Sequence, residues 1–167
     1  AATGLIPSGM TIIPSDNTDF VDEAGSVIEY DQDKAKEYWE TAKSELGIDS
    51  LDFEILASDT DSTKKVIEYI QSAVQDTLDG VTISLSPVPF SVRLDRSNTG
   101  DFDVVMGGWG ADYADASSFT DLFVTGNSYN RGQWSNEDYD AAVKASASTN
   151  AGDPEARWQN LLDAEKI

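Results

Sequence analysis

Hydrophobic and polar residues alternate along two stretches of the chain in the manner of half-buried strands. The alternation covers residues 51–56 and residues 81–86, in each of which every second residue is apolar. A third stretch, from Phe102 to Met106, is apolar at nearly every position. Such a run is typical of a parallel strand buried on both faces, so we expect it at the centre of a sheet.

Helical spacing of apolar residues marks two segments around these strands. Asp31 can cap the first, which Gly47 ends, and the second runs from Ser62 to Leu78 and is closed by Gly80. In each segment the apolar side chains share one helix face. They are Ala35, Tyr38, Trp39, Ala42 and Leu46 in the first, and Val66, Ile67, Ile70, Ala73, Val74 and Leu78 in the second.

Further helices are expected in the second half of the chain. One ends near Gly100, and another covers residues 119–123. The next starts at Ser135, with Asp138 three residues later as its capping partner. The last begins after the cap Asp153 and has a proline in its first turn, where the missing N–H costs little.

The order of these elements predicts the fold class. A strand–helix–strand–helix–strand succession implies parallel pairing, so the expected fold is α/β: a three-layer lobe with a mainly parallel sheet flanked by helices. We expect residues 1–167 to form this single lobe, with residues 1–30 extended and looping. Because the chain starts in a loop and its last apolar stripe is unfinished, we expect a piece of a longer protein.

Charge and composition exclude several functions. The 167 residues include 31 acidic and 11 basic ones, for a net charge of −20, and no basic cluster that could hold a nucleic acid or an anionic membrane. The chain lacks His and Cys, which removes their nucleophile systems and nearly every zinc site. The acidic run at Asp59 departs from a calcium loop at Lys64 and Ile70. We therefore expect no metal, cofactor or nucleic acid, and no membrane contact.

The stretch "DFDVVMGGWGADYADASSF", residues 101–119, carries the candidate site. Ligands of such sheets lie beyond the carboxyl ends of the strands, and "GGWGADY" occupies that position. The glycines lack the spacing of a dinucleotide fingerprint, and Asp112 stands where a phosphate would approach. A better reason for Gly108 and Gly110 is the close approach of another backbone, such as a peptide added as a strand.

Trp109 and Asp112 each admit two interpretations. Trp109 is either a core aromatic or, because it sits between glycines beyond an apolar strand, the wall of a pocket. Asp112 is either a cap for the helix that begins near Asp115 or a carboxylate held at the sheet edge as counter-charge for an ammonium group.

The segment "GDFDVVMGGWGADYADASSFTDLF" resembles one in the peptide-type extracytoplasmic solute-binding proteins of ABC importers, the oligopeptide-binding protein family. Its Trp–Asp–Tyr centre is quite specific. Weaker likeness extends over most of the chain, through "GLIPSGM", "DQDKAKEYWETA", "NEDYDAAVKAS" and "DPEARWQNLLDAEKI". The resemblance implies a periplasmic-binding-protein-like (type II) fold, in which two lobes close on an extended peptide, and it covers the second lobe.

The resemblance also implies roles for single residues and for partners. Asp112 would bind the α-amino group of the peptide, Trp109 would line the cleft, and Gly108 and Gly110 would offer backbone groups to the peptide main chain. The partners would be an oligopeptide ligand, the permease subunits of an ABC transporter and the first lobe of the full-length chain. The location would be extracytoplasmic, in the periplasm or on the outer face of the cell membrane as a lipoprotein, and the protein would not be an enzyme.

Some features depart from the family pattern and leave alternatives open. Some members use arginines around the strand to hold a peptide carboxylate, but Met106 occupies that strand position, and Arg93 and Arg96 do not align cleanly. Strict selection for short peptides is therefore not expected. A receptor of the same superfamily for another small cationic or amino compound remains an alternative. An alternative of another class is a hydrolase with a pair of carboxylates.

Overall fold

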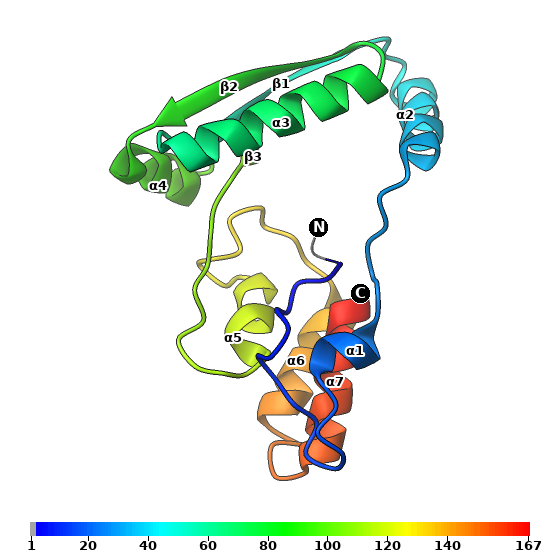
Figure 1. Ribbon diagram of the computed structural model, residues 1–167, viewed down its shortest axis with the longest axis vertical. Coiled ribbons are helices and arrows are strands. Elements are labelled where there is room, and N and C mark those ends of the chain that lie inside the picture. The colour runs from blue at the N-terminus through cyan, green and yellow to red at the C-terminus, as the bar shows by residue number, and fades with distance from the viewer. Residues whose placement is uncertain (1–2) are drawn as a thin grey trace. The chain divides into compact units, whose positions relative to one another are not determined.

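The computed structural model describes residues 3–167, which form two compact units. Tyr30–Gly108 form one, here called the sheet unit. The chain up to Glu29 and Trp109–Ile167 form the other, here called the helical unit. Each unit is described by itself (Figure 1). None of the helices within residues 3–167 is long and apolar enough to cross a membrane.

The sheet unit is built on three parallel strands in the order β2-β1-β3. Strand β1 spans Leu51–Ser58 and pairs along its whole length with β2, Val81–Val88. Strand β3 is the two residues Val104–Val105, which pair with Ile55 and Leu56 of β1. The parallel sheet expected from the order of elements is therefore confirmed.

Three helices complete the sheet unit: α2 Gln32–Leu46, α3 Asp61–Thr77 and α4 Phe90–Thr99. The expected cap of α2 is confirmed, because the Asp31 side chain accepts a hydrogen bond from the Lys34 N–H. Gly47 and Gly100 end α2 and α4 in the left-handed conformation that favours glycine.

The two faces of the sheet are covered by different helices. On one face, α3 lies along β1 and β2 (Figure 1), and its buried Ile67 packs with Ile55 and Ile83. Strand residues that alternate with Ile55 and Ile83 point to the other face, where α4 contacts them. Arg96 of α4 donates to Glu54 at 2.8 Å and to Ser86 at 3.2 Å. Helix, sheet and helix thus form the three layers that the sequence predicts.

The expectation for Phe102–Met106 is wrong in its position. Strand β1 is central and β3 lies at the edge, paired over two residues, with Val104 43% exposed. An apolar run shows that a strand tolerates burial, but the order of strands depends on where each crossover connection returns. The buried face of α2 is also narrower than expected, since Tyr38 and Leu46 of this helix are exposed.

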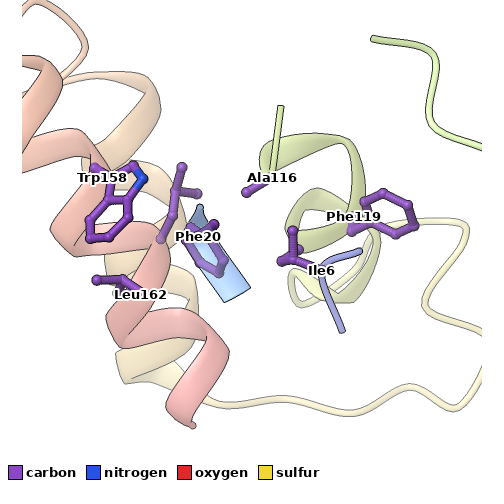
Figure 2. Close-up of a cluster of buried hydrophobic side chains, with 7 residues drawn as sticks. Ile6, Phe20, Ala116, Phe119, Trp158 and Leu162 are labelled. Carbon is purple, nitrogen blue, oxygen red and sulfur yellow. The ribbon is translucent and has the colours of Figure 1, made fainter. Parts of the chain in front are cut away.

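The helical unit contains α1 Phe20–Ala24, α5 Ser117–Thr120, the 3-10 helix η1 Asp121–Phe123, α6 Glu137–Ala147 and α7 Pro154–Lys166. Its core brings both ends of the chain together (Figure 2). The Phe20 ring meets the edge of the Trp158 ring, with 5.6 Å between centroids. Helix α1 thereby docks on α7, although residues 1–30 were expected to be extended and looping.

The predicted caps of the later helices hold in one case and fail in the other. Asp153 accepts from the Ala156 N–H at the start of α7, as expected. Helix α6 begins one residue later than expected, because Asn136 rather than Ser135 accepts from the backbone of its first turn. The Ser135 hydroxyl instead pairs with Thr125 at 2.9 Å.

Candidate functional site

The loop that follows Trp109 borders a pocket of about 210 Å³ within the helical unit. Aromatic, hydroxyl and acidic side chains share the lining, which includes two carboxylates and no basic residue. The lining residues are Trp109, Asp112, Tyr113, Ser117, Ser118, Asp121, Leu122, Asn127 and Tyr129. A concave site with several rings and an excess of negative charge suits a ligand that carries an ammonium group.

Trp109 is a wall of this pocket and is not a core residue. Its indole N–H donates to the Ser118 carbonyl at 2.8 Å, and its ring meets the edge of Tyr129 with 4.9 Å between centroids. The side chain is 38% exposed. It is therefore held in a fixed position while one part of the ring stays open to a ligand.

Asp112 also lines the pocket, and it does not cap the following helix. Its backbone N–H donates to the Ser118 hydroxyl at 3.2 Å. The side-chain contacts just before that helix belong to Asp115, whose carboxylate accepts from the N–H and the hydroxyl of Ser117 at 2.9 and 2.6 Å. The structure thus gives these contacts to Asp115 and leaves the exposed carboxylate of Asp112 at the pocket.

Asp115 is compensated by a cation from a distant part of the chain. Arg157 of α7 donates two parallel hydrogen bonds to it, at 2.9 and 2.7 Å. Partial burial acts to raise the pKa of Asp115, but the bonds from Arg157 and Ser117 outweigh it and hold that pKa below its usual value. Asp115 is therefore ionised and neutralised within the protein.

Asp121 is a second carboxylate of the pocket that sequence reasoning missed. Loss of hydration raises its pKa, the negative charge of Asp115 raises it further, and Arg157 opposes both effects. Tyr113 and Tyr129 were also missed. Tyr113 could have been found from its place directly after Asp112, whereas Asp121 and Tyr129 carried no local signal and reach the pocket through the fold.

The two predicted glycines, Gly108 and Gly110, do not line the pocket. Gly108 is the last residue of the sheet unit, while Gly110 belongs to the helical unit. An added Cβ would meet no atom within 4 Å at either position, and neither has a positive φ. Internal packing therefore does not require glycine at Gly108 or Gly110.

The described residues do not assemble a metal site. Within residues 3–167, no three acidic side chains come together in a way that could hold a metal ion. The chemistry available at the pocket is therefore that of carboxylates, hydroxyls, an amide and aromatic rings: recognition of a cationic or hydrogen-bonding group.

Comparison with known proteins identifies the family of this chain. Residues 1–131 match the family of bacterial extracellular solute-binding proteins, family 5 Middle. The dipeptide-binding protein of Lactococcus lactis subsp. cremoris is 41% identical over 150 residues, which cover 89% of this chain and 27% of that protein. The dipeptide-binding protein DppE of Bacillus subtilis is 31% identical over 153 residues, which cover 91% of this chain and 28% of that protein.

Solved structures share the fold as well. The crystal structure of a peptide-binding protein of a peptide ABC transporter has a TM-score of 0.94 at 61% identity, covering 98% of this chain and 72% of that one. OppA of Listeria monocytogenes bound to peptide has a TM-score of 0.90 at 40% identity, covering 99% of this chain and 31% of that one. The chain thus spans little more than a quarter of the two curated relatives. The resemblance and the periplasmic-binding-protein-like fold expected from the sequence are confirmed, and the chain belongs to family 5 of the bacterial extracellular solute-binding proteins.

Proposed function

We propose that this chain is the ligand-binding second lobe of an oligopeptide receptor, which captures extended peptides outside the cytoplasm and delivers them to the permease subunits of an ABC importer. The lobe comprises residues 1–167, and a first lobe of the full-length chain supplies the opposite wall. The receptor works in the periplasm or, as a lipoprotein, on the outer face of the cell membrane. The family is one of extracellular solute-binding proteins, which supports this role.

The pocket beside Trp109 carries the proposal. It presents Asp112 and Asp121, together with three aromatic rings, and its lining contains no basic residue. We assign Asp112 to the α-amino group of the peptide, because its carboxylate is exposed at the pocket and is not used as a helix cap. A carboxylate and an ammonium group form a charge-assisted hydrogen bond, which a closed cleft would strengthen.

The remaining predicted site residues serve the peptide main chain in this proposal. Trp109 shields the contact from water, and its fixed indole makes the wall rigid. Gly108 and Gly110 offer backbone groups to the ligand. The absence of any internal need for glycine at these two positions supports a role toward something outside the folded chain. Contacts to a backbone are independent of peptide sequence, which suits a receptor for many peptides.

A second candidate is a receptor for a small cationic or amino compound. The observation that favours it is the pairing of Asp112 with Asp121 among three rings, since such a set recognises an ammonium group without any peptide backbone. The hydrolase with a carboxylate pair gains no comparable support, because the family consists of solute-binding proteins.

Mass spectrometry of the ligands that copurify with the full-length receptor tests the proposal. A mixture of peptides of varied sequence is the expected result. A single non-peptide amine would select the second candidate, and turnover of a bound compound would select the hydrolase. Titration with penta-alanine and its N-acetylated form then tests the assigned anchor, because only the free form brings a positive charge to Asp112.

A further inference from the structure

The pocket loop is fixed by a contact that comes from outside the pocket. Arg157 reaches from α7 to Asp115, 42 residues away in the sequence, and grips both carboxylate oxygens. Neither residue lines the pocket. Two parallel bonds from a planar guanidinium define a direction as well as a distance, so this pair can set the position of the loop.

Arg157 is itself held by a rigid support. The next residue along α7, Trp158, is 5% exposed and packs edge-on against Phe20 in the core of the helical unit (Figure 2). Because the core holds this turn of α7 in place, the backbone of Arg157 is fixed, and this limits where its guanidinium can lie. Its side chain is 28% exposed, which limits screening of the ion pair by water.

A chain of hydrogen bonds leads from Asp115 into the pocket. Asp115 accepts from both the N–H and the hydroxyl of Ser117, and that hydroxyl lies 3.3 Å from the phenol of Tyr113. The neighbouring Ser118 accepts from the Asp112 N–H through its hydroxyl and from the Trp109 indole through its carbonyl. The positions of Asp112 and Trp109 thus depend on the turn that Asp115 organises.

We infer that Arg157 and Asp115 are the positioning pair of the ligand pocket, which aim the Asp112 carboxylate at the ligand without touching the ligand themselves. This inference rests on the proposed function. Arg157 also neutralises Asp115, so the charge presented to a ligand comes from Asp112 and Asp121. Removal of Arg157 should therefore misplace the anchor, and this loss should exceed the attraction of an ammonium group to the unpaired Asp115 carboxylate.

The test is the ratio of affinities of the full-length receptor for penta-alanine and for N-acetyl-penta-alanine, measured by calorimetry. Arg157→Gln should weaken binding of the free peptide by about tenfold and bind the acetylated peptide nearly as before, so the ratio falls. Asp115→Asn should act similarly. The double variant should lose little more than either single variant, because the two residues act through one contact.

Arg96→Gln is the matched control for lost stability. Arg96 lies in the sheet unit, is 25% exposed and bonds to Glu54 and Asp101, so its loss should lower the melting temperature comparably. The ratio of affinities should stay at the wild-type value in this control. A purely structural role for Arg157 would be shown by equal effects of the two substitutions on the ratio, and this would overturn the inference.

Arg157→Lys covers the case in which Arg157→Gln does not fold. Lysine keeps the charge but loses the two parallel bonds, so the ratio should fall by a smaller amount. A wild-type ratio in Arg157→Lys or in Arg157→Gln would overturn the positioning role alone. A wild-type receptor that binds both peptides equally would refute the proposed amino-terminal anchor, and the inference would fall with it.

Discussion

Three aspartates of the pocket region differ in charge environment although they lie within ten residues of each other. Asp115 is neutralised by Arg157, and the pKa of Asp115 is lowered as a result of that contact and those from Ser117, which together exceed the opposing effect of burial. Hydration loss raises the pKa of Asp121. Within residues 3–167, Asp112 forms neither a capping contact nor an ion pair with a guanidinium group, and its carboxylate faces the pocket. The lining of the pocket therefore carries net negative charge, which favours a cationic ligand.

Asp112→Asn in the full-length receptor should weaken binding of a peptide with a free amino terminus by roughly 30-fold or more. The ligand would keep its positive charge and lose the carboxylate that pairs with it. Titration of one peptide in free and N-acetylated forms measures the effect. The exposed Asp22, which lies outside the pocket, gives a control of equal charge in Asp22→Asn. Equal loss for both peptide forms would remove Asp112 as the anchor.

Glu165 should make stability depend on pH. Burial raises the pKa of its carboxyl above the ordinary 4.5, although bonds from the Leu5 and Ile6 N–H groups oppose the shift. A raised pKa means that the folded state binds the proton more tightly than the unfolded state. The stability contributed by this group is therefore present at low pH and is lost as the pH rises through the folded pKa.

Glu165→Gln tests this effect, because the amide keeps an oxygen for the Leu5 N–H but carries no charge. The melting temperature of the variant minus that of the wild type should increase from about pH 4 to about pH 7. A flat difference for Glu165→Gln would show that the carboxyl does not titrate differently in the folded state.

At the scale of elements, Gly80 and Gly100 have similar backbone conformations but differ in the space available for a side chain. Comparing substitutions at the two positions therefore distinguishes the cost of backbone strain from the cost of a steric clash. Gly80 and Gly100 have φ angles of +81° and +76°. A Cβ at Gly80 would lie 2.5 Å from the Asp49 carbonyl oxygen, whereas a Cβ at Gly100 would meet nothing within 4 Å. Gly80 therefore allows the close approach of two backbones at the start of β2.

Gly100→Ala should destabilise the protein by about 1–2 kcal/mol, the cost of a left-handed alanine. Gly80→Ala should cost about 1–3 kcal/mol more, because the Asp49 backbone must also move. Urea unfolding of both variants measures the difference. If the two free energies of unfolding fell by the same amount, the clash would be relieved by a small shift and Gly80 would be needed for its φ alone.

The sequence predicted elements whose signals are local. Helices α2, α3 and α7 carry caps and apolar spacing within their own residues, and the structure has them close to the predicted bounds. The five-residue α1 was missed because Phe20 is stabilised by contact with α7, which no local pattern shows. The edge position of β3 was missed because strand order is a property of the whole sheet.

The same distinction applies to the candidate site. Trp109 and Asp112 follow a strand in an unusual glycine-rich turn, so the sequence singled them out and the structure has both in one pocket. Their roles toward a peptide remain predictions. Arg157 and Tyr129 could not be found in this way, because their relation to the loop depends on the packing of α7 and on the path of the chain after η1.

At the scale of the whole molecule, the proposed two-lobed clamp has a consequence for the chain by itself. A single lobe offers one wall of the binding site, while the loss of translational and rotational freedom on binding stays nearly the same. The 167-residue chain alone should therefore bind penta-alanine at least about 100-fold more weakly than the full-length receptor. Calorimetry of both proteins with the same peptide would show this, and equal affinities would mean that the opposite wall adds nothing.

The division of the chain into two units also bears on its synthesis. The sheet unit is one uninterrupted stretch, Tyr30–Gly108, whereas the helical unit takes residues from both sides of that stretch. On the ribosome, every strand and helix of the sheet unit emerges before Trp109 does, so that unit can fold while translation continues. Phe20 emerges earlier still, yet its ring can pack on Trp158 only after the whole sheet unit has been made. The apolar segment around Phe20 thus lacks its partner on α7 while the sheet unit emerges, and during that interval it is available to chaperones.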